Sequence, residues 1–245
     1  RPSLNQRDPA PGPNTPTSPD SAGNPLLLPE LARGIDLAFE RYLEGGGILS
    51  ANLFARRVQH LMRRVIGLET VSWASVPRWV ARQQNIGDAR TQGLELEAKL
   101  RLDQAWRDAW PLEIRSNLSF YGSRVDNVPG PDNRLDSQPH ATGNLGFDYR
   151  LRSLPLTVGG NFNAVPGYRT QLSEEQAVTV STKRVVDAYA LWTLSPSAAL
   201  RLMASNLTAR DYHSTNTLDA LGVRNFSSTT SPTYVNWRAR LELKL

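Results

Sequence analysis

The sequence predicts an all-β protein, an antiparallel transmembrane β-barrel that is incomplete and contributes about nine strands. Apolar and polar residues alternate one by one over many segments, as they do in a strand with one apolar and one polar face. Several of these segments exceed the roughly five or six residues that are usual in soluble sheets. Short turns and long polar loops follow each other in turn, which is typical of bacterial outer-membrane barrels.

Residues 1–28 are predicted to be an extracellular loop or an irregular lead-in, because seven prolines in this segment prevent regular strand pairing; a disordered tail is the alternative. The first strand, about 31–43, places Ile35, Leu37 and Phe39 on one face. The glycine-rich segment 44–47 is predicted to be a short turn. The second strand, about 48–64, alternates in the same way.

The third strand is predicted to be long, at about 78–102, and its second half has the most regular alternation before the C-terminus. Leu94, Leu96 and Ala98 stand against Glu95 and Glu97 there. The fourth strand spans about 112–122. Segment 103–111 joins the two and is the longest connection on the short-turn side.

Five more strands are predicted at about 140–151, 156–164, 184–194, 198–207 and 234–245. The last one alternates apolar with charged or amide residues, and no helical repeat of 3.6 residues fits it. Short turns fall at 152–155 and 195–197, and long polar loops fall at 65–77, 123–139, 165–183 and 208–233.

A barrel with short periplasmic turns and long extracellular loops turns its apolar faces to lipid and its polar faces to the lumen. Tryptophans near the strand ends then become candidates for interfacial girdles: Trp106, Trp110, Trp192 and Trp237. For Trp192, ordinary core packing is an alternative. Nine strands cannot close a single-chain bacterial barrel, which has an even strand count, so we expect the chain to be a piece of something larger.

Composition narrows the function classes. The 245 residues contain no Cys, which excludes disulfides and thiolate metal sites. The net charge of +5 is spread over strand-like positions, so no nucleic-acid partner is expected. No apolar run approaches the ~20 residues of a transmembrane helix, and the first 25 residues lack a signal-peptide pattern. His60, His140 and His213 are isolated from catalytic or metal-ligand partners, so we predict no enzyme, no metal and no cofactor.

Three short motifs resemble one family. The segment 24–37 reads Asn-Pro-Leu-Leu-Leu-Pro-Glu followed by Gly-Ile-Asp-Leu, the segment 85–97 reads Asn-Ile-Gly-Asp-Ala-Arg-Thr-Gln-Gly-Leu-Glu-Leu-Glu, and Asn206-Leu207-Thr208 precedes a loop. In order and spacing they resemble the C-terminal barrel half of TonB-dependent outer-membrane receptors. The family usually ends in an aromatic residue, whereas this chain ends in Leu245.

The resemblance implies that residues 29–245 are part of a 22-stranded barrel in the outer membrane of a Gram-negative bacterium, with the plug domain and the first barrel half absent from this chain. It implies energy-coupled uptake of a scarce small molecule, most often a ferric siderophore, driven by the TonB complex through the absent N-terminal region. Two alternatives stay open: a passive pore or adhesin-like barrel, and a soluble β-rich binding module.

Two groups of loop residues are candidate sites. Aromatic and Arg residues in the loops are predicted to contact the ligand: Trp73, Trp79, Tyr168, Arg169, Arg210 and Tyr212. A cluster near the extracellular rim is predicted to contact the phosphates of lipopolysaccharide through charge-assisted hydrogen bonds: Arg56, Arg57, Arg63 and Arg64. Polar loop residues without a ligand and solvated rim charges are the respective alternatives.

Overall fold

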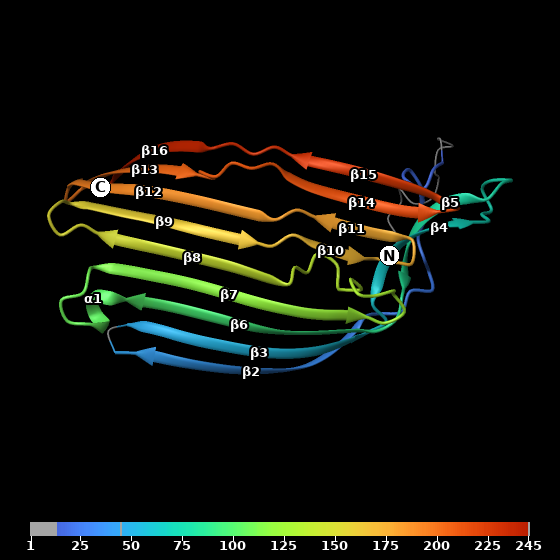
Figure 1. Cartoon of the computed structure of the whole chain (residues 1–245), viewed down its shortest axis with the longest axis horizontal. Coiled ribbons are helices and arrows are strands. Elements are labelled where there is room, and N and C mark those ends of the chain that lie inside the picture. Colours follow the sequence, from blue (N-terminus) through green and yellow to red (C-terminus); the bar gives the residue numbers. More distant parts are fainter. Residues whose placement is uncertain (1–13, 45, 245) are drawn as a thin grey trace.

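A nine-stranded antiparallel sheet forms the body of the molecule (Figure 1). The computed structural model describes residues 14–44 and 46–244. Each strand pairs with the next of the series, so the sheet is an up-and-down meander with free edges at its first and last strands. Its members are β2 (Leu31–Leu43), β3 (Gly47–Gln59), β6 (Ala89–Arg101), β7 (Leu112–Val125), β8 (Ala141–Arg150), β9 (Leu156–Val165), β12 (Lys183–Ser195), β13 (Ala198–Ser205) and β16 (Asn236–Leu243). The predicted all-β, unclosed antiparallel architecture is confirmed.

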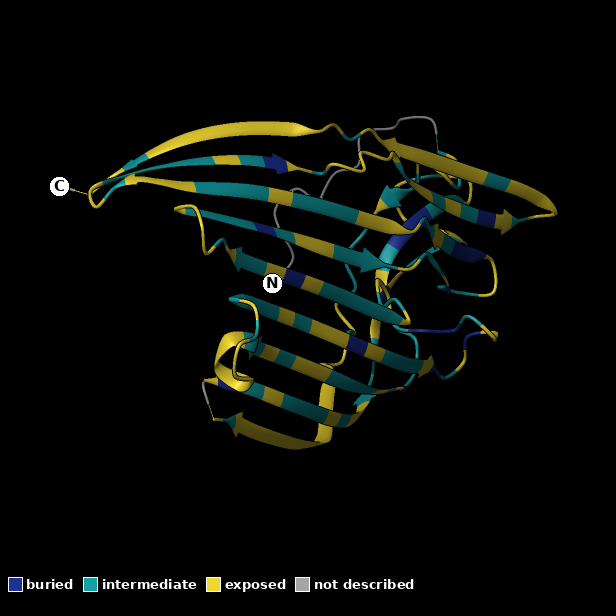
Figure 2. Ribbon diagram, turned by 60° about the vertical axis from the view of Figure 1, so that its left-hand side comes forward, coloured by how far each residue is buried: buried dark blue, intermediate teal, exposed yellow. Residues whose placement is uncertain are grey.

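The two faces of this sheet differ in chemistry, because residues directly opposite each other on neighbouring strands share a face. Leu37, Leu53, Leu94 and Phe120 stand in one cross-strand row, and all but Leu94 are among the exposed large hydrophobic residues. We call this side the apolar face. The opposite side, the polar face, carries Glu, Asn, Lys and Arg. Figure 2 shows exposed residues along both edge strands and alternating exposure between them.

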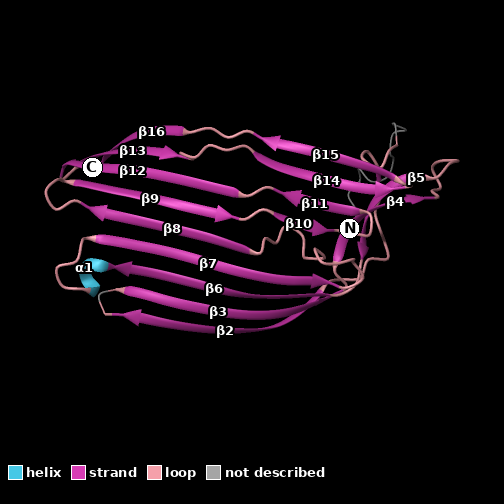
Figure 3. Ribbon diagram, viewed as in Figure 1, coloured by secondary structure: helices cyan, strands magenta, loops and turns pink. Residues whose placement is uncertain are grey.

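The short connections gather at one end of the sheet, where the helical turn α1 (Leu102–Ala105) also lies (Figure 3). Gly45 of the predicted turn 44–47 falls outside the described residues, as do residues 1–13 and Leu245. Trp192 is 53% exposed, which excludes the core-packing alternative, and Trp106, Trp110 and Trp237 are more exposed still. No helix in the described part of the chain is long and apolar enough to span a membrane.

Two predicted long strands were wrong in length. The segment 48–64 breaks at His60, whose φ of 58° is left-handed, and continues as β4 (Met62–Glu69). The segment 78–102 breaks at Gly87, with a φ of 130°, which divides β5 (Arg78–Asn85) from β6. Hydrogen bonds of Leu61 with the two residues around this second break, at 2.8 and 2.9 Å, hold the breaks opposite each other. The hairpin therefore bends as a unit, and β4 and β5 leave the nine-stranded sheet.

The loops are also more regular than predicted. Segment 165–183 contains β10 (Tyr168–Gln171) and β11 (Gln176–Val180), and segment 208–233 contains β14 (Tyr212–Ala220) and β15 (Val223–Ser231). These four strands form their own antiparallel sheet in the order β10-β11-β14-β15. Ser, Thr and Asn occupy both faces of β14 and β15, so no apolar alternation marks them in the sequence.

The second small sheet has the order β1-β5-β4, in which β1 (Asp20–Ser21) runs parallel to β5. The rest of the described lead-in, from residue 14, is irregular as predicted. Buried apolar residues concentrate around these small sheets and the adjacent strand ends. Ala89, Val125 and Val128 form a core cluster there, with Val58 and Leu135 packed against it. This core fixes the loop end of the molecule.

Candidate functional site at the loop end

The two small sheets enclose a cavity, which we call the inter-sheet cavity. Its volume is about 320 Å³. One side comes from the lead-in and β4, and the other from β11, β14 and β15. Hydroxyl and amide side chains predominate among its lining residues: Pro16, Thr17, Pro19, Arg64, Ile66, Gln176, Ser214, Asn216, Leu218, Asn225, Ser227 and Thr229.

Arg64 is the charged member of this lining. Its side chain is exposed, and none of the ion pairs among the described residues involves it. Gln176 donates to Asn216 across β11 and β14 at 3.3 Å, which orients two of the amides at the cavity wall. The cavity therefore combines neutral hydrogen-bonding groups with a cation that has no carboxylate partner, a combination that suits a polar, anionic small molecule.

An ion pair anchors the lead-in that forms one wall. Arg78 holds Asp20 with two hydrogen bonds, 2.5 Å from Nε and 2.9 Å from Nη2. Trp73 donates its indole N–H to the same carboxylate at 3.2 Å. Hydrogen bonding from Arg78 is the main reason that the pKa of Asp20 falls to about 2, against the opposing effect of burial. Asn14 adds a reciprocal pair of bonds to the backbone of Trp79, at 2.6 and 2.9 Å.

Trp73 and Trp79 were both predicted as ligand contacts. Trp79 lies in β5 and Trp73 in the loop that joins β4 to β5, and there the Trp73 indole and the Trp79 backbone hold the lead-in. The other four predicted contacts lie on or beside the four-stranded sheet. Neither group lines the inter-sheet cavity. The structure therefore divides the six predicted residues between two places.

Tyr168 is the first residue of β10 and Tyr212 the first residue of β14, so both lie at the same end of the four-stranded sheet. Val180 of β11 pairs with Tyr168 on one side and, on the other, with Ser214, two residues after Tyr212. Tyr212 donates its hydroxyl to the carbonyl of Arg184 at 3.3 Å, and the Nζ of Lys183 lies 5.4 Å from the centre of its ring.

The two predicted arginines of this group differ in their surroundings. Arg169 donates to Gln171 at 3.2 Å and lies 3.8 Å from the carboxylate of Asp132. Arg210 is exposed, and its backbone carbonyl accepts a bond from Thr233. Arg210 makes no ion pair with a described residue, whereas Arg169 is partly neutralised by Asp132.

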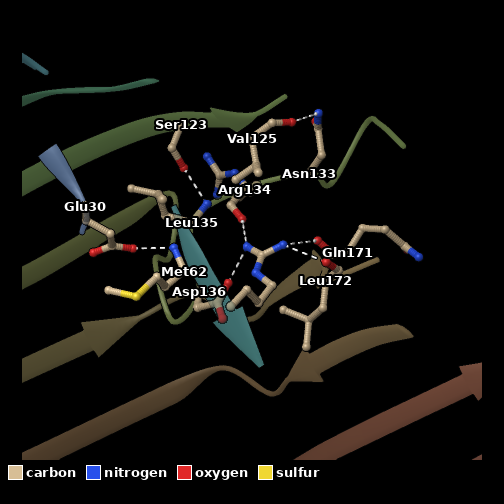
Figure 4. Close-up of polar contacts among 11 residues, drawn as sticks. Glu30, Met62, Ser123, Val125, Asn133, Arg134, Leu135, Asp136, Gln171 and Leu172 are labelled. Carbon is tan, nitrogen blue, oxygen red and sulfur yellow. Dashed lines mark hydrogen bonds and ion pairs between the residues drawn. The ribbon is translucent and has the colours of Figure 1, made fainter. Parts of the chain in front are cut away.

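Arg63 of β4 joins the loop after β7 to the turn after β10 and is buried, with 2% of its side chain exposed. Its guanidinium donates to the carbonyls of Leu172 at 2.8 Å and Arg134 at 2.9 Å and pairs with the carboxylate of Asp136. Figure 4 shows these partners, together with the weaker contact to the Gln171 carbonyl at 3.4 Å. A side chain this deep cannot reach a lipid phosphate, so the prediction of such a contact was wrong for Arg63.

The loop that follows β7 is fastened by further buried polar groups. Asn133 donates to the carbonyls of Val125 and Val128 at 2.9 and 3.0 Å. Arg134 donates to the Tyr121 carbonyl at 3.1 Å, and desolvation by burial lowers its pKa. These bonds hold the loop that follows β7 in place around Arg63. The sequence gave no sign of these bonds, because a run of polar loop residues does not specify which backbone carbonyls its side chains meet.

The other three arginines of the predicted rim cluster separate. Arg56 lies on the polar face, paired with Asp36 at 2.8 Å, and Arg64 lines the inter-sheet cavity. Arg57 lies on the apolar face, 2.9 Å from Asp88.

One signal in the sequence could have found the β14–β15 hairpin, which lines the cavity. Leu221-Gly222 forms the two-residue turn of this hairpin, with φ values of 53° and 75°. In the described part of the chain, no three His, Asp or Glu residues are grouped to hold a metal ion.

Comparisons with known proteins agree with this architecture. The family model "TonB dependent receptor-like, beta-barrel" matches residues 1–226. No curated protein sequence matches the chain. Among solved structures, the ferric enterobactin receptor PfeA of Pseudomonas aeruginosa in complex with enterobactin has a TM-score of 0.56 at 15% identity, over 78% of this chain and 28% of that chain.

Two further structures are similar. The siderophore receptor PirA of Acinetobacter baumannii has a TM-score of 0.52 at 17% identity, over 78% of this chain and 29% of that one. The F5-1 variant of the FrpB iron transporter of Neisseria meningitidis has a TM-score of 0.53 at 15% identity, over 86% of this chain and 31% of that one. The chain spans less than a third of the length of each of these structures. At these identities, the similarity establishes the fold.

Proposed function

The chain belongs to the TonB-dependent receptor β-barrel family, and from this premise we propose that it forms one side of an outer-membrane receptor that takes up a scarce small molecule, a ferric siderophore. Membership of this family supports a location in the outer membrane, and the proposal turns the apolar face of the nine-stranded sheet toward lipid and its polar face toward the lumen. The loop end is then extracellular. The similar structures are a ferric enterobactin receptor, a siderophore receptor and an iron transporter, which supports this ligand class.

The inter-sheet cavity carries the proposal. It presents hydroxyl and amide groups around Arg64, and ferric siderophores are polar complexes, many of them anionic. Arg64 would donate charge-assisted hydrogen bonds to such a ligand without first giving up a carboxylate partner. Among the six residues predicted from the sequence, Arg210 and Tyr212 remain proposed contacts at the loop surface, with Trp73, Trp79, Tyr168 and Arg169 as additional contacts.

Ligand binding by the complete receptor tests this cavity. Arg64→Gln is expected to weaken the binding of a ferric siderophore by about tenfold, the effect of losing one charge-assisted hydrogen bond. Arg107→Gln is the matched control, because Arg107 is an exposed arginine at the opposite, short-turn end of the sheet. Equal affinity in the two variants would exclude Arg64 from the site. Likewise, unchanged affinity after alanine substitution of Tyr168 and Arg169 would exclude those two residues.

Energy coupling separates this proposal from a passive pore or adhesin-like barrel. We propose that a plug and further strands complete the receptor, because β2 and β16 leave free edges that a membrane does not tolerate. Uptake through the TonB complex is expected to stop when the proton-motive force is dissipated, whereas diffusion through an open pore would continue. Iron uptake by cells, measured with and without a protonophore, distinguishes the two.

The intact mass of the protein extracted from outer-membrane fractions tests whether the missing parts belong to the same polypeptide. A mass two to three times the 27.2 kDa of this chain is expected for a complete plugged receptor. A mass near 27.2 kDa would mean that a partner chain has to supply the other strands. The soluble-module alternative predicts instead that the protein stays in solution without detergent, which the exposed apolar face opposes.

A further inference from the structure

Four arginines from four consecutive strands of the nine-stranded sheet stand directly opposite one another. Arg33 of β2 pairs with Arg57 of β3, Arg57 pairs with Arg90 of β6, and Arg90 pairs with Arg124 of β7. We call these residues the arginine row. All four are exposed. Since neighbouring strands lie about 4.8 Å apart, the row extends over about 15 Å.

The arginine row lies on the apolar face, at its loop end. The next cross-strand row on the same face, two residues away along each strand, consists of Ile35, Ala55, Gln92 and Gly122. The row after that consists of Leu37, Leu53, Leu94 and Phe120. The arginine row thus lies one row away from the large apolar side chains. A groove of about 730 Å³ runs over the arginine row and the intervening row of Ile35, Ala55, Gln92 and Gly122, where Ala55 and Gly122 are small.

The charge of the row is largely uncompensated. Like charges directly opposite each other in a sheet are destabilising, yet Arg57 has Asp88 at 2.9 Å and no other member of the row makes an ion pair with a described residue. On the polar face, in contrast, Arg56 is matched by Asp36 at 2.8 Å. A row of cations held this close is stabilised when anions bind between its members.

We propose that the arginine row binds the phosphate groups of an anionic glycolipid of the outer leaflet, as in lipopolysaccharide. The planar guanidinium fork matches phosphate geometry, and neighbouring arginines can share one phosphate. The acyl chains of the lipid lie along Ile35, Leu37 and Phe120 on the adjoining apolar surface. This inference rests on the orientation in the outer membrane given under the proposed function, but not on ligand uptake.

The groove favours a lipid over a free phosphate ion. An inorganic anion would use only the guanidinium side, whereas the groove also contains Ile35 and Ala55 and is followed along the strands by the exposed row of Leu37, Leu53 and Phe120. Of the arginines first predicted to contact lipopolysaccharide, Arg57 belongs to the arginine row, and Arg56 lines the same groove although it pairs with Asp36 on the polar face. Arg33, Arg90 and Arg124 join Arg57, since they share its face and its level along the strands.

The test uses the complete receptor in phosphatidylcholine nanodiscs, titrated with bis-phosphorylated lipid A, and native mass spectrometry counts the bound lipid. The variant is Arg33→Gln/Arg90→Gln/Arg124→Gln, which removes three cations without leaving an unpaired carboxylate. The matched control, Arg41→Gln/Arg107→Gln/Arg152→Gln, removes three exposed arginines at the short-turn end. We expect about tenfold weaker binding in the variant and wild-type binding in the control.

Equal binding by wild type and variant would overturn the proposal. So would equal binding of dephosphorylated lipid A by the wild type, and this second comparison decides the matter even where the triple variant does not fold. Competition by millimolar inorganic phosphate as strong as that by lipid A would mean a free-anion site and would also overturn it. Iron uptake is measured in parallel: loss of lipid binding with normal uptake separates this site from the proposed transport function.

Discussion

Neighbouring residues of this protein have opposite fates, because a one-residue step along a strand changes the face. Arg63 is buried between two loops, whereas Arg64 reaches the inter-sheet cavity. Arg56 and Arg57 are divided in the same way between the polar and apolar faces. A cluster of arginines in the sequence is therefore not a cluster in space, and each side chain has its own partners and its own role.

Arg63 is expected to stabilise the loop end. Arg63→Met leaves the carbonyls of Leu172 and Arg134 and the carboxylate of Asp136 without their donor, which should cost about 2–3 kcal/mol of local stability. Hydrogen exchange of residues 131–139 and 168–176 measures this loss. Arg64→Met is the matched control, since it removes the same charge one residue away. Equal exchange in both variants would contradict the anchoring role of Arg63.

Asp20 makes the lead-in sensitive to strong acid. Its pKa is depressed from 3.8 to about 2, so its ion pair with Arg78 contributes stability above pH 3.8 that is lost as the pH falls toward 2. The fluorescence of Trp73, which donates to Asp20, should change over this range. The difference between wild type and a Trp73→Phe variant isolates that signal.

Asp20→Asn is expected to abolish this acid transition and to loosen the lead-in already at pH 7. The exposed Glu174 makes no ion pair with a described residue, so Glu174→Gln should keep the wild-type transition. A transition that survives in Asp20→Asn would show that another group controls the lead-in.

At the scale of elements, two bends and one close approach between strands shape the nine-stranded sheet. His60 and Gly87 bend the β3–β6 hairpin so that β4 and β5 turn out of the sheet. Lower along the same strands, Gly93 of β6 lies opposite Phe54 of β3, and the Phe54 ring covers it. The ring also lies near Tyr121, at 6.3 Å between ring centres.

Gly93→Ala tests this close approach. A Cβ at Gly93 would lie 2.6 Å from the Phe54 ring and 2.7 Å from the Phe120 carbonyl, so the strands have to shift, at a cost of about 1–3 kcal/mol. Gly122→Ala is the control, because its nearest neighbour, Gln92, is 3.8 Å away. Thermal unfolding in detergent, followed by gel mobility, compares them. Equal unfolding temperatures would mean that β3 and β6 adjust freely.

At the scale of the whole molecule, nearly all of the described buried apolar residues lie at the loop end. The rest of the nine-stranded sheet holds almost none of them. The nine-stranded sheet exposes its apolar face, and under the proposed function lipid covers it. Trp110 lies at the short-turn end of this sheet and Trp237 at the loop end of β16, both exposed. They are placed as the two interfaces of a membrane require.

Quenching by brominated lipids checks this placement. In the complete receptor, bromine near the lipid headgroup should quench Trp110 and Trp237 more strongly than bromine near the end of the acyl chain. Trp79, on the small β1-β5-β4 sheet, should show little quenching from either position and serves as the internal control. Strongest quenching from the bilayer centre would contradict the assigned faces and levels.

The sequence by itself determined the strands of the nine-stranded sheet, their two faces and the end at which the long loops lie. Each of these follows from local pattern: side chains alternate with period two, and glycine, proline and polar runs interrupt the alternation. The family resemblance over residues 24–245 also rested on short local motifs, and the family model bears it out.

Only the tertiary structure decided which residues come into contact across different strands and loops. Register placed Arg33, Arg57, Arg90 and Arg124 in one row, and no local pattern specifies register between strands that lie far apart in the sequence. The inter-sheet cavity and the burial of Arg63 likewise depend on pairing among polar loop strands, whose two faces look alike in the sequence. Long-range contacts, rather than alternation, make these sites.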